Sequence, residues 1–234
     1  MNKKIIVENV SDFYDYVMKN TNFGYEDFPI SFNMTDKGEK KLLLVIGDNA
    51  EGKSLITSQM LSYAHKNSDI NGYNIGMQAR TRGGIERSFV YANENMCSTG
   101  FSTVLSVTGG IRNCVSHSKD SHHQMMLVLD EPTLGLSDRY ERPMGEYIAN
   151  TIKENKELDN FKGIILVTHS KELVRSLINN DVFPTVVYVG DNFKSLNEWL
   201  NTSEHATLEE LLGIYDKGNA KKRSVKDFFK KYNN

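Results

Sequence analysis

The chain has few of the residues that cross-link, stiffen or anchor a protein. Its 234 residues include four prolines, too few for a stiff linker, and two cysteines, Cys97 and Cys114, that lack metal-ligand spacing. We therefore expect free thiols in a reducing, cytoplasmic setting. No apolar run approaches the roughly 20 residues that span a bilayer. An acidic residue at position 8 comes too early for a secretory signal peptide, and we expect no membrane span.

A surplus of charge of one sign is also missing. The formal net charge of −2 excludes a globally basic nucleic-acid binder but leaves room for a local basic patch. With 39% hydrophobic and 25% charged residues, the composition is ordinary for a globular protein. The length suffices for one sizeable core, and no repeat or heptad array divides the chain. The sequence therefore predicts a single globular domain.

Apolar runs that are typical of buried strands alternate with helical patterns. The expected strands cover residues 30–34, 42–46, 73–77, 125–129, 163–167 and 186–189. The expected helices cover residues 12–20, a stretch after residue 54, 110–118, 138–153, a stretch ending at residue 177, and most of the remainder. Strands that alternate with helices in this way indicate an α/β fold, with a mostly parallel sheet flanked by helices on both faces.

The most informative segment is GDNAEGKS, residues 47–54, which directly follows the apolar run 42–46. It has the form G-x-x-x-x-G-K-S, a phosphate-binding P-loop. Its backbone N–H groups and the start of the next helix would face a phosphate. Lys53 would reach the β- and γ-phosphates, and the Ser54 hydroxyl would ligate Mg²⁺. The expected nucleotide-binding residues of this segment are Gly47, Asn49, Ala50, Glu51, Gly52, Lys53, Ser54 and Leu55.

Polar residues follow two further strands. Asp130 and Glu131 end the run 125–129, where open α/β sheets bind ligands. Asp130 would hold Mg²⁺, and Glu131 would orient or deprotonate an attacking water. His169 follows the run 163–167 and could contact a γ-phosphate oxygen. The alternatives are a solvated acidic turn and a structural histidine.

The order of the motifs resembles the ABC-type ATPase superfamily. The P-loop resembles G-x-N-G-x-G-K-S, with Asn49 matching and Ala50 departing. Residues 107–112, VTGGIR, resemble a degenerate L-S-G-G-Q-R signature in which Thr108 replaces the serine. Residues 130–138, DEPTLGLSD, resemble D-E-P-T-x-x-L-D, with one extra residue that leaves open whether Ser137 or Asp138 is the D-loop residue.

This resemblance implies a function for each motif. His169 matches the switch histidine of the family, and Gln78 is the candidate Q-loop residue and a further Mg²⁺ ligand. Glu131, His169 and Lys53 would be catalytic, with ATP and Mg²⁺ as cofactors. Two heads would pair head-to-tail, so that Thr108, Gly109 and Gly110 sense the γ-phosphate bound to the other head. The resemblance thus implies a homodimer or a paired ABC head.

Three functions stay open at this stage. The first is an ATPase like the heads of SMC-like and RecF-like proteins, without a coiled coil. It would drive conformational change in a protein partner or a nucleic-acid complex, in genome maintenance, phage biology or defence. The short interval between residues 78 and 107 favours it, and Arg80, Arg82 and Arg87 could meet phosphate backbones there. The second is the nucleotide-binding subunit of a membrane transporter. The third is a regulator that uses ATP only to assemble.

The two ends of the chain differ in character from its middle. We expect a lead-in over residues 1–40, a nucleotide-binding core over 41–190, and C-terminal helices with a basic tail over 191–234. The tail concentrates lysines from residue 217 to residue 231 and could bind nucleic acid or dock on a partner. In the lead-in, Phe28 or Phe32 could stack on adenine, and the sequence does not choose between them.

Overall fold

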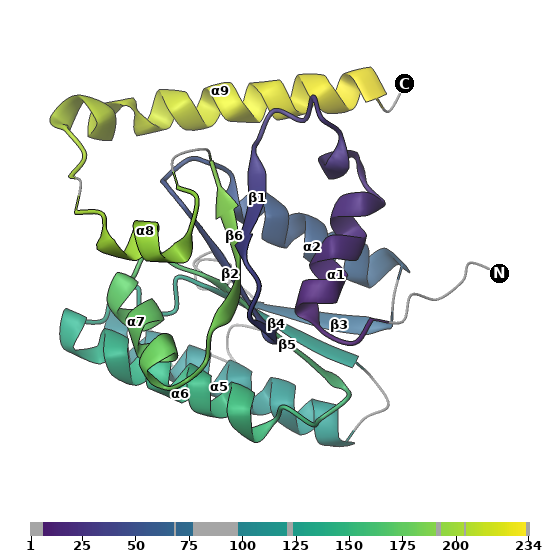
Figure 1. Cartoon of the computed structure of the whole chain (residues 1–234), viewed down its shortest axis with the longest axis vertical. Helices are drawn as coiled ribbons and strands as arrows, with labels where there is room; N and C mark the ends of the chain where they lie inside the picture. Colours follow the sequence, from purple (N-terminus) through teal and green to yellow (C-terminus); the bar gives the residue numbers. More distant parts are fainter. Residues whose placement is uncertain are drawn as a thin grey trace.

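The computed structural model of the chain describes residues 7–67, 69–76, 98–120, 124–190, 193–203 and 205–232 (Figure 1). Strands and helices alternate along this part of the chain, as expected. Gln78, Cys97 and the three arginines at positions 80, 82 and 87 lie outside the described residues.

One mixed sheet forms the centre of the molecule. Its strands are β1 (Phe32–Asp36), β2 (Glu39–Gly47), β3 (Ile70–Ile75), β4 (Gln124–Asp130), β5 (Phe161–Val167) and β6 (Pro184–Val189). They lie in the order β1-β6-β2-β5-β4-β3. All neighbouring pairs are parallel except β1 and β6, which are antiparallel. The predicted α/β class with a mostly parallel sheet is therefore confirmed.

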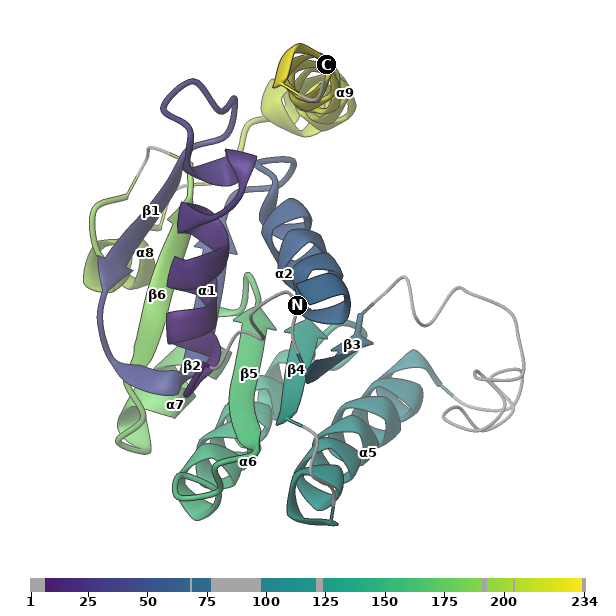
Figure 2. The same cartoon turned by 90° about the vertical axis from the view of Figure 1, so that its right-hand side faces the viewer.

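Helices cover both faces of the sheet (Figure 2). They are α1 (Val10–Lys19), α2 (Lys53–Asn67), α5 (Thr99–Asp120), α6 (Glu141–Glu154), α7 (Lys171–Asn179), α8 (Leu196–Asn201) and α9 (Leu208–Tyr232), with short 3₁₀ helices at Asn22–Gly24 and Asp138–Tyr140. Within β2, Leu42, Leu44 and Ile46 belong to one buried cluster, with α5, α6, α7 and α8. Leu43 and Val45 belong to the other, with α1, α2 and α9. Successive side chains of a strand point to opposite faces, which is why a strand buried on both sides has no polar positions.

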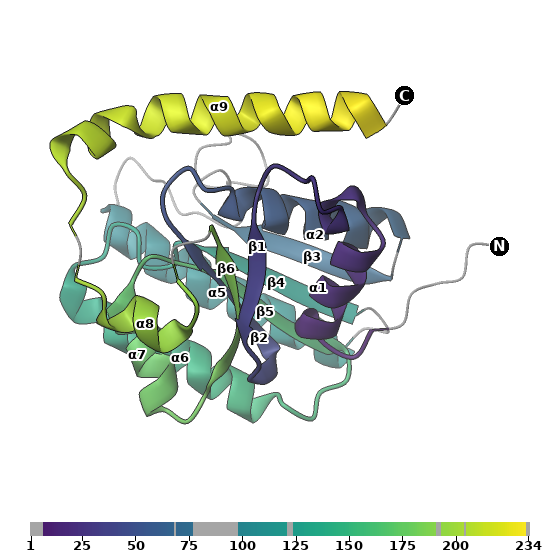
Figure 3. The same cartoon turned by 45° about the horizontal axis from the view of Figure 1, so that its top comes forward.

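The last helix crosses one edge of the molecule. α9 runs above α2 and the loop before β1, as Figures 1 and 3 show. Phe228 and Phe229 at its C-terminal end pack on the loop that precedes β1. The Phe228 and Phe28 ring centroids are 5.0 Å apart, and those of Phe229 and Phe23 are 6.1 Å apart. Aromatic pairs at these distances are stabilising, so residues far apart in the sequence fix α9 in place.

Element boundaries follow the predictions closely in most places, with one clear exception. The expected helix from residue 110 begins eleven residues earlier, because α5 covers Thr99–Asp120. Val107, Ile111 and Cys114 form its buried stripe, and burial raises the pKa of the Cys114 thiol to about 12. None of the helices in the described part of the chain is both long enough and apolar enough to cross a membrane.

Candidate functional site

The order of the strands gathers three of the predicted motifs at one edge of the sheet. β5 lies between β2 and β4, and all three run parallel. Their carboxyl ends lead into the P-loop, into Asp130 and Glu131, and into Thr168 and His169. A cavity of about 470 Å³ opens there, and its lining includes Asp48, Asn49, Ala50, Gly52, Lys53, Ser54, Leu55, Asp130, Glu131 and His169. The structure thus brings together residues that the sequence could only assign to separate strand ends.

The backbone of the P-loop requires glycine at two positions. Gly47 has φ 150°, and a Cβ there would lie 2.3 Å from the carbonyl oxygen of Val189. Gly52 has φ 114°, and a Cβ there would lie 2.7 Å from the Ile30 side chain. Ala50 also has a positive φ, 62°, which costs a residue with a Cβ about 1–2 kcal/mol. This position is the one where the ABC-type pattern has glycine.

Lys53 is buried and folds back on its own loop. Its ammonium donates to the carbonyl oxygens of Gly47 at 2.7 Å and Asp48 at 2.9 Å, and lies 3.0 Å from His169 Nε2. These three contacts use all three donors of the ammonium. Burial lowers the pKa of Lys53 to about 8, and the nearby carboxylates of Glu131, Asp48 and Asp130 oppose that shift. A phosphate that replaced the two carbonyls would offer this cation a charged partner.

His169 is neutral near pH 7. Partial desolvation and then the charge of Lys53 lower its pKa to about 4, although the side chain stays 42% exposed. Since Lys53 can only donate, the contact at 3.0 Å requires an unprotonated Nε2 on His169. Nε2 also lies 3.3 Å from Glu131 Oε1, but a neutral ring forms no ion pair there. The neutral ring therefore accepts a hydrogen bond from Lys53 at Nε2. This bond would break if a ligand bound Lys53 instead.

Glu131 combines a raised pKa with an unusual backbone. Burial raises the pKa of its carboxyl to about 7, although it accepts bonds from the His169 N–H at 3.3 Å and the Thr168 hydroxyl at 3.4 Å. Its φ is 53°, a conformation that costs a non-glycine residue of order 1–3 kcal/mol and that is common at functional sites. A carboxyl with a pKa near the working pH suits a general base.

The same cavity offers oxygen ligands for a magnesium ion. The Ser54 hydroxyl and the Asp130 carboxylate both line it. Gly76, at the end of β3, lies so close to Asp130 that a Cβ on it would be 2.9 Å from Asp130 Cβ. No group of three or more His, Cys, Asp or Glu side chains suited to a metal occurs among the residues that the structure describes. This donor set fits Mg²⁺, which prefers one or two protein oxygens together with waters and substrate phosphates.

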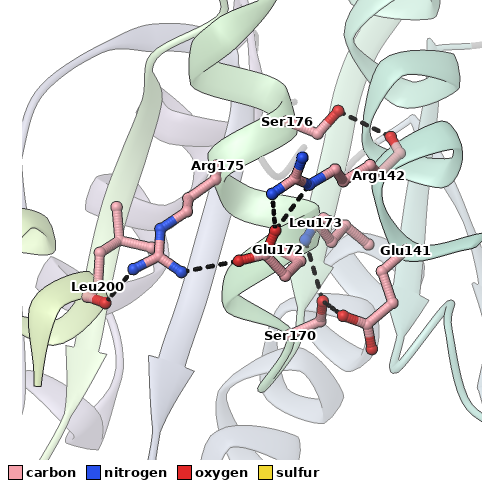
Figure 4. Close-up of polar contacts among 8 residues, drawn as sticks. All are labelled: Glu141, Arg142, Ser170, Glu172, Leu173, Arg175, Ser176 and Leu200. Atoms are coloured by element: carbon pink, nitrogen blue, oxygen red, sulfur yellow. Dashed lines mark hydrogen bonds and ion pairs between the residues drawn. The ribbon is translucent and has the colours of Figure 1, made fainter. Parts of the chain in front are cut away.

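A set of polar contacts fixes the turn that carries His169 (Figure 4). Ser170 accepts a bond from the Leu173 N–H at 3.0 Å, capping α7, and donates to Glu141 of α6 at 2.8 Å. Farther along, Glu172 of α7 accepts from Arg142 at 2.7 Å and from Arg175 at 2.9 Å. Because these bonds tie the end of β5 to α6 and α7, the position of His169 depends on both helices.

The predicted signature residues do not lie at the start of a helix. Thr108, Gly109 and Gly110 lie in the middle of α5, where backbone N–H groups bond to the preceding turn. The Thr108 hydroxyl donates to the Val104 carbonyl, and a Cβ on Gly110 would lie 2.8 Å from the side chain of Ile75. The expectation that Thr108–Gly110 begin a helix is therefore wrong, and their contact with a partner's γ-phosphate stays a prediction. Gly110 instead lets α5 approach the end of β3.

The residues that do begin this helix are Ser98, Thr99 and Gly100, and sequence reasoning missed them. They line a second cavity, of about 660 Å³, together with Gly135, Leu136 and Ser137. The Thr103 hydroxyl donates to the Leu134 carbonyl at 2.7 Å, which joins α5 to the segment after Glu131. Ser137 and the 3₁₀ helix that begins at Asp138 belong to this region and do not line the P-loop cavity. A serine and a threonine just before the stripe of residues 103, 107, 111 and 114 are the start signal that was available.

α9 supplies a wall of the P-loop cavity that sequence reasoning also missed. Gly218, Lys221, Lys222, Val225 and Lys226 line it. Glu51 of the P-loop is an ion-pair partner of both Lys217 and Lys221. Glu51 therefore holds α9, although the sequence assigned it to the nucleotide. Phe28 and Phe32 pack on each other and line a different pocket, whereas Ile30 lines this one.

The chain matches no model of a known protein family, and no curated protein matches it either.

Proposed function

We propose that the protein binds and hydrolyses ATP as a P-loop ATPase that resembles the heads of ABC-type enzymes. One observation carries the proposal. Lys53, Asp130, Glu131 and His169 come from three strand ends and line one cavity at the carboxyl edge of a parallel sheet. Open α/β sheets bind ligands at this edge. A solvated loop or a structural histidine would not require these groups to converge.

The residues have separate functions in the proposed reaction. The backbone N–H groups of residues 50–54 and the start of α2 would bind the β-phosphate, and Lys53 would exchange the carbonyls of Gly47 and Asp48 for phosphate oxygens. Ser54 and Asp130 would hold Mg²⁺, which supplies charge neutralisation at the phosphates. Glu131 would accept a proton from the attacking water, for which a pKa near 7 is suitable. His169, released from Lys53, would donate or accept a bond near the γ-phosphate.

The surface around the start of α5 supports a paired state. Phe101, Val104, Leu134 and Tyr140 are large apolar side chains that are exposed beside the second cavity. We propose that a second copy, or another ABC-type head, covers this surface and that Ser98 and Thr99 meet the nucleotide held by that partner. Hydrolysis would then separate the two heads and drive conformational change in a protein or nucleic-acid complex. We do not assign nucleic-acid binding to the C-terminal lysines, because several of them line the P-loop cavity or pair with acidic side chains.

An ATPase assay with three variants tests the proposal. Lys53→Ala removes a charged partner of the phosphates and should weaken ATP binding by a factor of about 10–100. Glu131→Gln should keep ATP binding but lower kcat by at least about 100-fold. Lys66→Ala is the matched control, since Lys66 is exposed at the far end of the same helix, α2. Wild-type protein without ATP binding, or equal activity in all three variants, would refute the proposal.

The paired state has its own measurement. Light scattering after size-exclusion chromatography, with and without ATP, should show a dimer for Glu131→Gln in the presence of ATP. Phe101→Asp places a charge on the exposed surface and should prevent that dimer without lowering the affinity of the monomer for ATP. A monomer under every condition would count against the second copy.

A further inference from the structure

The P-loop cavity has a wall that none of the three motifs accounts for. Five residues of α9 line it in an i, i+3, i+4, i+7, i+8 pattern: Gly218, Lys221, Lys222, Val225 and Lys226. This pattern places them on one face of α9. The helix therefore presents a stripe to the cavity, and three of its five residues are cationic.

Contacts at both sides of this stripe fix α9 over the P-loop. Lys217 Nζ lies 2.5 Å from Glu51 Oε1, and Lys221 pairs with the other oxygen of the same carboxylate. At the C-terminal end, Phe228 is buried against the ring of Phe28. A Cβ on Gly218 would lie 3.5 Å from Ala50 Cβ, so the helix backbone runs close to the loop. The stripe is thus part of the folded site rather than a mobile tail.

Two lysines of the stripe have charges that the protein itself does not neutralise. Lys222 and Lys226 are exposed, and within the part of the chain that the structure describes neither has an ion-pair partner. They nevertheless line a cavity of about 470 Å³, a size typical of small-molecule sites, with α9 in place. The helix therefore borders the cavity without filling it.

We propose that Lys222 and Lys226 bind the nucleotide through its non-transferred part, the α- and β-phosphates. This inference rests on the proposed function. α9 contacts the P-loop at Ala50 and Glu51, whereas His169 contacts both Lys53 and Glu131 at the strand ends. The transferred γ-phosphate belongs at the end where Lys53, Glu131 and His169 gather. The lysines of α9 therefore face the phosphates that remain after hydrolysis, and they hold ADP as well as ATP.

Nucleotide affinity measured on a double variant tests this inference. An exposed ion pair is typically worth a factor of about two to five, so Lys222→Ala with Lys226→Ala should weaken binding about tenfold. The loss should be equal for Mg-ATP and Mg-ADP, measured by isothermal titration calorimetry on the full chain. It should shrink as salt is raised, because exposed charges are screened. Lys222→Arg with Lys226→Arg should retain the affinity.

The matched control removes two other cations from the same helix. Arg223 and Lys230 are exposed and do not line the cavity, so Arg223→Ala with Lys230→Ala changes the net charge equally. This control should bind both nucleotides like wild type. Three results would each overturn the inference. They are an equal loss of nucleotide affinity in the two double variants, no loss of affinity in either, and tighter binding without Lys222 and Lys226. Failure of the proposed function looks different, because wild type would then bind no ATP or would bind it independently of Lys53.

Discussion

The partly buried carboxyl of Glu131 predicts that the proposed general base lowers the stability of the protein. Its pKa is about 7 in the folded, nucleotide-free chain, whereas an unfolded glutamate has a pKa near its ordinary value of 4.5. The folded state thus favours the protonated carboxyl. The favourable contribution is complete below pH 4.5 and is lost as the pH rises from about 4.5 to about 7. Glutamine resembles the protonated carboxyl and cannot lose its proton.

The magnitude follows from the two pKa values. A difference of about 2.5 units corresponds to at most about 3 kcal/mol. Glu131→Gln should raise the free energy of unfolding by about 1 kcal/mol at pH 5 and by about 3 kcal/mol at pH 8. Under the proposed function this gain should accompany a loss of hydrolysis, as in active sites that carry a destabilising group.

Urea unfolding of wild type and Glu131→Gln at pH 5, 6, 7 and 8, without nucleotide, measures this difference. His169 titrates in both proteins, so its contribution cancels, whereas the charge of Glu131 also raises the pKa of Lys53, so the difference near pH 8 belongs to this pair. Glu146→Gln, on an exposed position of α6, provides the control and should leave the pH profile unchanged. A pH-independent difference between wild type and Glu131→Gln, or a variant less stable at pH 8, would refute the reasoning.

Three further predictions follow from local contacts. Gly109→Ala should stabilise α5 by up to about 1 kcal/mol, because a Cβ there meets nothing within 4 Å, whereas Gly110→Ala should lower stability by about 1 kcal/mol or more through contact with Ile75. Thermal unfolding measures both effects. A stable Gly109→Ala variant without ATPase activity would restore a nucleotide role for this segment. Glu51→Gln should lower the free energy of unfolding by about 1–2 kcal/mol and speed hydrogen exchange in residues 217–226, because it breaks two ion pairs. The control Glu209→Gln, at an exposed position, should leave this exchange unchanged. Unchanged exchange in Glu51→Gln would contradict the contact with α9. Ser170→Ala should lower stability by about 1 kcal/mol through loss of the α7 cap, a larger effect than that of Ser224→Ala on the exposed face of α9, and equal melting temperatures would contradict it.

The sequence predicts the sheet and its helices because their signals are local. The run 42–46 has no polar position, and such a run predicts a strand buried on both faces. The order of the strands is not local information. It nevertheless decides that His169 lies between the P-loop and Glu131, since β5 separates β2 from β4. Local patterns could name these residues, and only the resemblance to a known family placed them in one site.

Two errors have a common physical origin. The Gly109–Gly110 pair indicates a turn when only neighbouring residues are considered, yet tertiary packing keeps it helical because Ile75 fills the space beside Gly110. The lysines of α9 indicate a tail that binds nucleic acid or docks on a partner, whereas the distant Glu51 pairs with two of them and holds the helix against the P-loop. Both outcomes depend on contacts between residues that are far apart in the chain, which a pattern of neighbours does not contain.

The place of β2 in the sheet also determines when the P-loop can form during synthesis. β2 pairs with β5 and β6, and both are translated long after residues 39–47. Pairings between distant segments are slow to form, and until they form the apolar residues 42–46 have no sheet partners. In a ribosome-bound chain that ends before residue 189, the pairing of β2 with β6 is therefore incomplete, and the proposed nucleotide could assist folding only at a late stage of translation.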